Sequence, residues 1–286
     1  MRYAFVAQER THYPVRLLCR VLTVSVSGFH DYLHRQGRPD PDAALRADLR
    51  TIHAGSRGTY GRPRMVQALR ACAHAVGHKR VARLMREEGL RGKTKGRFRP
   101  RTTDSRHSRP VAENRLNRQF AVDSPTPAWV GDITYIPTRE GWLYLATVID
   151  LRTRQVLGYS LSERMPDDLV QQAFLNAWTA SPPSGSVLFH SDRGSQYASG
   201  QFQRTITSLG FEPSMSRKGN CWDNAVAESF FATLKNEEVT GTYDTKEAAH
   251  RAIANYIHGF YNPTRLHSAL GYLSPDDYAT RMKQAA

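Results

Sequence analysis

The sequence predicts an α/β domain preceded by an all-α region, and three observations lead to this prediction. In the first part of the 286-residue chain, apolar residues recur every three or four positions, as in short helices. After Pro127 the pattern changes to strand-like alternation or continuous apolar runs, followed by alternating helices and strands. The charge changes as well: residues 1–118 hold 26 basic and 9 acidic side chains, a net charge of +17, whereas residues 119–286 carry −3. We therefore expect two differently built parts joined by a basic segment.

The composition excludes several classes of protein. With 40% hydrophobic and 23% charged residues, the chain is globular rather than disordered. No apolar run reaches the roughly 18 residues of a membrane span, since Asp150 interrupts the best candidate. The three cysteines form no CxxC pair, which argues against a disulfide framework and a cysteine-rich zinc site. Without a signal peptide, we expect a cytoplasmic, nucleoid-associated protein with no membrane partner.

Residues 1–95 predict a series of short helices that together resemble a helix-turn-helix DNA-binding region. Apolar stripes at helical spacing occupy Val15–Leu22, Phe29–Leu33, Leu45–Ile52, Met65–Cys72 and Val81–Glu88. Tight glycine-containing turns separate the last three stripes, as in a helix-turn-helix unit. A small helical bundle with a solvated, charged face fits this pattern equally well.

Basic side chains in this front half point to a nucleic acid as the partner. Lys79, Arg83 and Arg86 share one side of the last predicted helix and are candidate DNA contacts. Residues 96–121 show no helical periodicity and few apolar side chains, which predicts a basic linker or arm. We expect its residues Arg97, Arg99 and Arg101 to follow a phosphate backbone.

Residues 122–286 predict the α/β domain, which ends in a helical tail. Three successive strands are expected at Trp129–Pro137, Trp142–Asp150 and Gln155–Leu161. The elements expected after them are a helix at 167–180, a strand at 186–190, and helices at 201–209, 223–238 and 246–261. This order is typical of a layered α/β domain in which antiparallel strands lead into a mixed sheet.

Three carboxylates lie where these elements could bring them together. Asp132 is in the middle of an apolar strand, Asp192 follows a short strand, and Glu228 lies in the first turns of a helix. Three convergent carboxylates form an oxygen-rich site for Mg²⁺ or Mn²⁺, and two such ions could clamp both oxygens of a phosphoryl transfer. The alternative is a hydrogen-bonded structural Asp132, because an unpaired buried carboxylate costs several kcal/mol.

The blocks GDITYI, HSDRGSQY and WDNAVAESFFATLK resemble the DDE catalytic core of the insertion-sequence-three (IS3) transposases. The similarity is to the product of their second reading frame, which is related to retroviral integrases. The tail YNPTRLHSALGYLSPDDY and the front segments LCRVLTVSVSGFHDYLHR and GTYGRPRMVQAL extend the resemblance to essentially the whole chain. It implies a ribonuclease H-like core with a mixed five-stranded sheet.

The resemblance also implies roles for individual residues. Asp132, Asp192 and Glu228 would be the catalytic, metal-binding triad, with two Mg²⁺ or Mn²⁺ ions as cofactors. Lys235, seven residues after Glu228, matches a basic family position and would meet DNA phosphate. Three residues around Asp192 are secondary candidates for contacts with the DNA end, namely His190, Arg193 and Gln196. We expect Asp150 to serve a turn and Asp223 to cap a helix instead.

The predicted function is that of a transposase, which cleaves the ends of its mobile element and joins them to target DNA. The expected partners are double-stranded DNA and further copies of the chain. The resemblance adds an upstream-frame product as a possible partner or fusion. Two alternatives are a ribonuclease H-like nuclease without strand transfer and a non-catalytic DNA-binding regulator.

Overall fold

The computed structural model describes residues 1–36, 39–94, 109–121, 127–218 and 220–285. The chain divides into two compact units, Met1–Thr51 and Ile52–Ala286, and helix α4 (Ala43–Gly55) crosses the division. Within the described ranges, no helix is long and apolar enough to cross a membrane.

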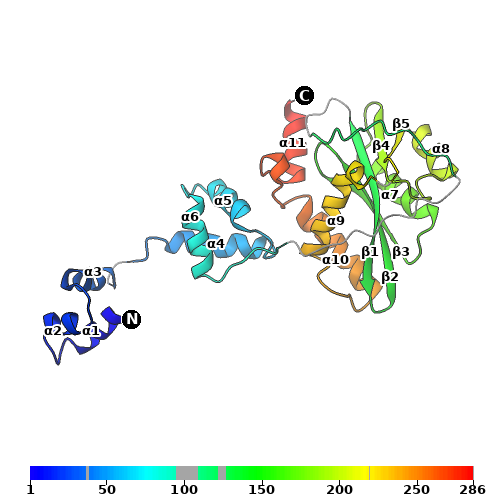
Figure 1. The fold of residues 1–286 in the computed structure, drawn as a ribbon. Helices are drawn as coiled ribbons and strands as arrows, with labels where there is room; N and C mark the ends of the chain where they lie inside the picture. Colours follow the sequence, from blue (N-terminus) through cyan, green and yellow to red (C-terminus); the bar gives the residue numbers. More distant parts are fainter. Residues whose placement is uncertain (37–38, 95–108, 122–126, 219, 286) are drawn as a thin grey trace. The chain divides into compact units, whose positions relative to one another are not determined.

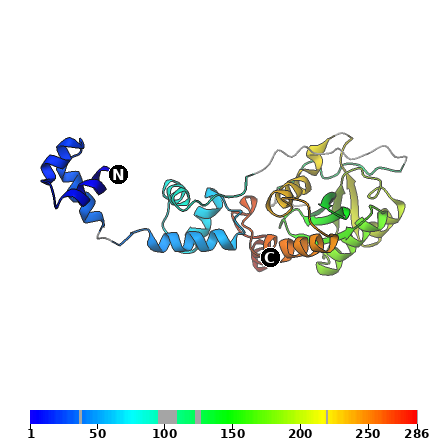
Figure 2. The same cartoon turned by 90° about the horizontal axis from the view of Figure 1, so that it is seen from below.

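The first unit contains three helices around a small apolar core (Figures 1 and 2, dark blue). These helices are α1 (Arg2–Glu9), α2 (Val15–Val21) and α3 (Val26–Gln36). The core residues are Val6, Leu18, Cys19 and Phe29, all with 9% or less of their surface exposed. The two predicted stripes of this region are confirmed as α2 and α3, whereas α1 was not predicted.

Helices α5 (Arg62–Ala71) and α6 (His78–Glu87) belong to the second unit and pack against each other. The apolar sides of both helices are buried, which confirms the predicted stripes; they contain Met65, Val66, Leu69, Val81, Leu84 and Met85. Pro63 lies in the first turn of α5, where its missing N–H would have no helical partner in any case. This helix pair therefore groups with the sheet. The sequence placed the end of the helical region at residue 95, whereas the two compact units divide after Thr51.

The second unit is built on a mixed five-stranded sheet in the order β3-β2-β1-β4-β5 (Figure 1). Its strands are β1 (Ala128–Thr138), β2 (Gly141–Asp150), β3 (Val156–Ser162), β4 (Val187–Ser191) and β5 (Phe211–Met215). Strands β1, β2 and β3 pair antiparallel, whereas β4 pairs parallel with both β1 and β5. Asp150 accepts hydrogen bonds from Arg152 and Thr153 and thus serves the turn after β2, as predicted. The predicted mixed sheet is confirmed.

One face of the sheet is covered by α7 (Asp167–Ala180) and α8 (Gly200–Ser208). Phe174 of α7 lies at the centre of this core and contacts the rings of Trp129 and Phe211. Strand β3 approaches α7 so closely that a Cβ on Gly158 would lie 2.3 Å from the backbone nitrogen of Ala177. Only glycine fits there without moving the helix.

The other face of the sheet meets α9 (Ala225–Glu237) and α10 (Lys246–Tyr256), which contact β1. A short 3₁₀ turn, η1 (Cys221–Asn224), precedes α9, so the predicted helix at 223–238 begins two residues later than expected. The predicted helix at 246–261 changes into a π-helical turn, η2 (Ile257–Tyr261), where α10 ends. A 3₁₀ turn, η3 (Ser268–Leu270), and helix α11 (Pro275–Ala285) complete the tail.

A buried ion pair attaches this tail to α9. Glu237, at the end of α9, accepts hydrogen bonds from Arg265 Nε and Nη2, each at 2.7 Å, and from the Tyr256 hydroxyl at 2.8 Å. The segment before α5 joins the same region, because the Tyr60 hydroxyl donates to the carbonyl of Thr264. The tail that contains the motif YNPTRLHSALGYLSPDDY is thus part of the core of the second unit.

The described part of the predicted basic linker, residues 109–121, packs against β5 within the second unit. Leu116 is buried, and the hydroxyl oxygen of Ser214 on β5 accepts hydrogen bonds from the backbone N–H groups of Arg115 and Leu116. The arginines of this segment form ion pairs with the unit: Arg109 with Asp167, Arg115 with Glu212, and Arg118 with Asp223. This segment was predicted as a basic linker or arm, and in the structure its three arginines are paired with carboxylates of the protein.

Candidate active site

The parallel pairing of β1 with β4 brings two of the predicted carboxylates together. Gly131 is paired with Ser191 in the register, so Asp132 and Asp192 follow at the same level of neighbouring strands. Adjacent strands lie about 4.8 Å apart, which puts the two backbones side by side. Asp132 stands in mid-strand, whereas Asp192 begins the turn after β4, where its Oδ1 accepts the N–H of Gly194 at 2.9 Å.

Helix α9 adds Glu228 and Lys235 to this edge of the site. Glu228 lies in the first turn of α9 and Lys235 in the last, seven residues apart and therefore on the same face. Because α9 packs on β1, that face meets Asp132.

The electrostatics show that the three carboxylates share one environment. Burial raises the pKa of Asp132 well above its usual range, and the charges of Asp192 and Glu228 raise it further. Burial also raises the pKa of Glu228, again with a contribution from Asp192. Lys235 has its pKa lowered by burial, while the charge of Asp132 acts in the opposite direction. The structure therefore brings the predicted triad and Lys235 close enough to interact.

Tyr197 is a neighbour of the triad that was not predicted. Its ring is buried, and burial, followed by the charges of Asp132 and Asp192, raises its pKa well above the usual range. A Cβ on Gly131 would lie 3.2 Å from the Tyr197 hydroxyl oxygen, so this oxygen reaches β1 beside Asp132. Its place in the block HSDRGSQY, five residues after Asp192, was the available signal.

The carboxylate oxygens of the three residues are chemically suited to bind a divalent cation. Carboxylate oxygens are the ligands that Mg²⁺ and Mn²⁺ prefer, and the mutual repulsion expressed in the pKa of Asp132 would be relieved by such a cation. As the described side chains stand, no three His, Cys, Asp or Glu residues are close enough together to hold a metal ion.

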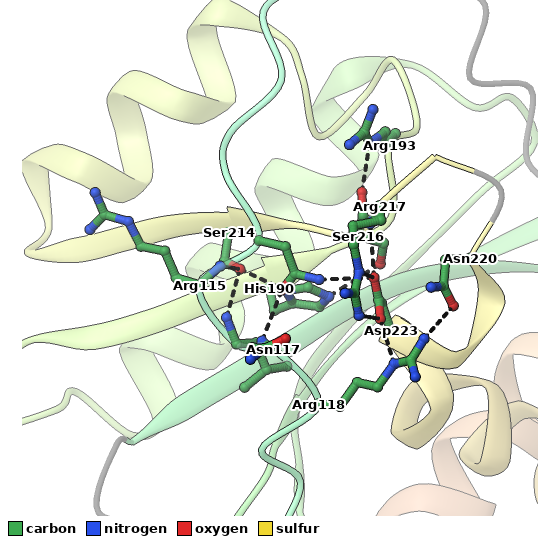
Figure 3. Close-up of polar contacts among 12 residues, drawn as sticks. Arg115, Asn117, Arg118, His190, Arg193, Ser214, Ser216, Arg217, Asn220 and Asp223 are labelled. Carbon is green, nitrogen blue, oxygen red and sulfur yellow. Dashed lines mark hydrogen bonds and ion pairs between the residues drawn. The ribbon is translucent and has the colours of Figure 1, made fainter.

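His190 does not lie where a DNA contact would need it. Its side chain is fully buried, with Nδ1 2.8 Å from Ser214 Oγ and Nε2 3.2 Å from Ser216 Oγ (Figure 3). Ser214 Oγ already accepts two backbone N–H groups, so its own proton is directed to Nδ1 and leaves Nε2 as the protonated nitrogen. Burial lowers the pKa of His190 to about 4, which keeps the ring neutral. The expectation that His190 touches the DNA end is therefore wrong.

Asp223 also differs from its expected role. The side chain is fully buried and makes no helix cap; Asn224 holds the N-cap position of α9, without a side-chain capping bond. Figure 3 shows the guanidinium groups of Arg118 and Arg217 converging on Asp223. These two arginines hold the pKa of this carboxyl well below its usual range.

The candidate DNA-binding residues fall into three groups. Lys79, Arg83 and Arg86 are exposed on α6, where Arg83 pairs with Glu87. Arg193 is partly buried, and its Nε donates to the carbonyl of Ser216 at 2.6 Å. The predicted arm residues Arg97, Arg99 and Arg101 lie outside the described residues.

Comparison with known families matches two regions of the chain. Residues 123–221 and residues 209–275 each match an integrase core domain family. Residues 40–98 match an HTH-like domain family.

The chain is similar over nearly its whole length to proteins of bacterial insertion elements. It is 40% identical over 272 residues to the insertion element IS600 uncharacterized 31 kDa protein of Shigella sonnei. This alignment covers 94% of this chain and 100% of that protein. It is 38% identical over 287 residues to the transposase InsF for insertion sequence IS3A of Escherichia coli. This alignment covers 98% of this chain and 99% of that protein.

Solved structures of retroviral integrases are more distant. A simian T-cell lymphotropic virus intasome in complex with the PP2A regulatory subunit B56 gamma aligns with a TM-score of 0.42 and 16% identity, over 77% of this chain and 70% of that one. The HTLV-2 integrase catalytic core domain in complex with magnesium aligns with a TM-score of 0.41 and 17% identity, over 54% of this chain and 96% of that one.

Proposed function

The chain belongs to the IS3 insertion-sequence transposases, and from this membership we propose that Asp132, Asp192 and Glu228 form its catalytic site. The observation that supports the assignment is the level pairing of β1 and β4, which sets two of these carboxylates side by side beneath the helix that carries the third. The charge of Asp192 raises the pKa of both Asp132 and Glu228, as expected for three carboxylates that lie close together.

These carboxylates would hold Mg²⁺ or Mn²⁺, with two ions as the expected number. Bound divalent cations neutralise charge on the transferred phosphoryl group and lower the pKa of water. The partly buried position of the three carboxylates keeps them in a low-dielectric environment, where charge interactions are stronger than in water. Lys235 faces the same site and contributes a cation for the phosphate next to the scissile bond.

The reaction we assign consists of two phosphoryl transfers on DNA. Water first attacks a phosphorus at the element end, which breaks the P–O3′ bond and leaves a free 3′-hydroxyl. That hydroxyl then attacks a phosphorus in the target strand, and the target's own 3′-oxygen leaves. Because water and the freed 3′-hydroxyl are the attacking groups in the two steps, no covalent link between the chain and DNA is required.

The helical part of the chain is assigned to DNA recognition. The exposed residues Lys79, Arg83 and Arg86 would meet the element ends, and Arg193 would lie near the cleaved strand. Arg97, Arg99 and Arg101 would add contacts to phosphates that do not depend on sequence. We infer that the chain acts as an oligomer on DNA, with an upstream-frame product as a further partner or as the other part of a fusion.

The two alternative functions have no observation in their favour. A nuclease without strand transfer would not need the HTH-like domain matched by residues 40–98. A non-catalytic regulator would not need three neighbouring carboxylates, two of which have a raised pKa, beside a partly buried lysine.

The test is to change each carboxylate to its amide and to measure cleavage and joining of a labelled element-end duplex with MgCl₂ or MnCl₂. Asp132→Asn, Asp192→Asn and Glu228→Gln are each expected to lower the rate by at least about a thousandfold, roughly 4 kcal/mol in activation free energy. Gel shifts with the same duplex should be unchanged, because these side chains do not grip the DNA backbone. A variant that cleaves at a near-wild-type rate would remove its residue from the triad.

A further inference from the structure

The segment that leads into α9 is fastened by one buried carboxylate. Asp223 is fully buried and accepts hydrogen bonds from Arg217 Nε at 2.9 Å, Arg217 Nη2 at 2.7 Å and Arg118 Nε at 2.9 Å. The backbone N–H of Arg217 and the side-chain amide of Asn114 donate to its Oδ2 at 2.9 and 2.8 Å. The reaction assigned above does not use this group, so its five donors need another explanation.

The position of Asp223 in the chain determines where α9 starts. It lies two residues before Ala225, the first residue of α9, and five before Glu228. An α-helix turns by about 100° per residue, so a shift of one residue at its start would turn Glu228 away from β1. The N-cap residue Asn224 makes no side-chain capping bond that would fix this start locally.

The same network reaches the strand that carries Asp192. Ser214 and Ser216 hold the neutral ring of His190 on β4, two residues before Asp192 (Figure 3). Arg193, one residue after Asp192, donates to the carbonyl of Ser216 next to Arg217. Polar contacts therefore run from the turn after β4, through the end of β5, to the start of α9.

We propose that Asp223 is a positioning residue of the transposase site: with Arg118 and Arg217 it fixes Glu228 relative to Asp192. This inference rests on the proposed catalytic triad. Arg118 comes from the predicted basic linker, residues 96–121, and is 105 residues away in sequence, so this clamp of Asp223, Arg118 and Arg217 also ties the linker to the site. A role limited to fold stability would lower the melting temperature without changing how strongly the site binds a metal ion.

The experiment therefore measures metal affinity as well as activity in the full-length chain. MnCl₂ is titrated by calorimetry into the wild type and into Asp223→Asn, Arg118→Met, Glu228→Gln and Glu212→Gln, and duplex cleavage is followed against MnCl₂ concentration. Glu212→Gln is the matched control, because Glu212 pairs with Arg115 of the same segment but about half of each side chain is exposed. Circular dichroism checks that each variant is folded.

Asp223→Asn is expected to weaken Mn²⁺ binding about tenfold and to raise the Mn²⁺ concentration for half-maximal cleavage by the same factor. Cleavage at saturating Mn²⁺ should return toward the wild-type rate, and Glu212→Gln should match the wild type throughout. Arg118→Met should shift both midpoints in the same direction by less, since it leaves Arg217 in place. If Asp223→Asn does not fold, Arg118→Met tests the positioning role in its place.

The positioning role would be overturned if a folded Asp223→Asn variant kept the wild-type midpoints of Mn²⁺ binding and of Mn²⁺-dependent cleavage. If only Arg118→Met folds, the same result in that variant would overturn it. Glu228→Gln separates this outcome from a failure of the triad itself. If Glu228→Gln binds Mn²⁺ as the wild type does, the triad is wrong and the positioning role is lost with it. If Glu228→Gln loses Mn²⁺ binding while the clamp variants keep it, only the positioning role is wrong.

Discussion

Removing one charge from the buried Glu237–Arg265 pair is expected to destabilise the second unit strongly. Only 5% of the Glu237 side chain and 4% of the Arg265 side chain are exposed. The carboxylate accepts two hydrogen bonds from the guanidinium, and Oε2 also accepts one from Tyr256. Glu237→Gln would leave a buried guanidinium without a counter-charge and would place an amide NH₂ against a donor.

The magnitude follows from this geometry. Breaking a buried ion pair by removing one partner costs about 3–5 kcal/mol, because the remaining charge is left uncompensated. We therefore expect Glu237→Gln to lower the free energy of unfolding by about 3–5 kcal/mol. The double variant Glu237→Gln/Arg265→Met removes the stranded charge as well, so its cost should be well below the sum of the two single variants.

Urea unfolding followed by tryptophan fluorescence measures these differences, since Trp129 is buried in the core of the same unit. The matched control is Glu247→Gln, which breaks an exposed Glu247–Arg251 pair at i,i+4 spacing. Such a pair is worth about 0.5 kcal/mol or less. The role of the pair would be refuted if the free energy of unfolding of Glu237→Gln lay within about 1 kcal/mol of the wild-type value. It would also be refuted if the double variant lost as much stability as the two single variants together.

Three further outcomes are expected. The wild type should lose stability as the pH falls from 6.5 toward 4, because burial lowers the pKa of His190 from 6.5 to about 4 and the unfolded chain takes up the proton first. His190→Gln should flatten this dependence in urea unfolding at several pH values, and an unchanged slope would contradict the buried neutral ring. Gly158→Ala should cost about 1–3 kcal/mol by forcing β3 away from α7, whereas Gly185→Ala, where a Cβ meets nothing within 4 Å, should be nearly neutral; equal melting temperatures would count against that close contact. Neutralising Lys79, Arg83 and Arg86 together should reduce the preference for element-end DNA over scrambled DNA in salt titrations, and an equal loss on both duplexes would refute base reading by α6.

The sequence by itself predicted most of the helices and strands, and it singled out the three carboxylates proposed as the triad. The apolar run around Asp132 and the short apolar run before Asp192 predicted two strands, and the stripes beginning at Met65 and Val81 predicted α5 and α6. These patterns can be read directly because side chains repeat every two residues along a strand and every 3.6 along a helix.

Only the tertiary structure decided which polar residues are partners. Asp223 resembled a helix cap from its neighbours in sequence, yet its partner Arg118 lies 105 residues away. The basic charge of the front half indicated a nucleic acid as the partner, yet Arg109, Arg115 and Arg118 pair with carboxylates of the second unit. Local periodicity is a property of the backbone, whereas the pairing of a buried charge depends on which distant segments fold against it, and spacing along the chain does not encode that choice.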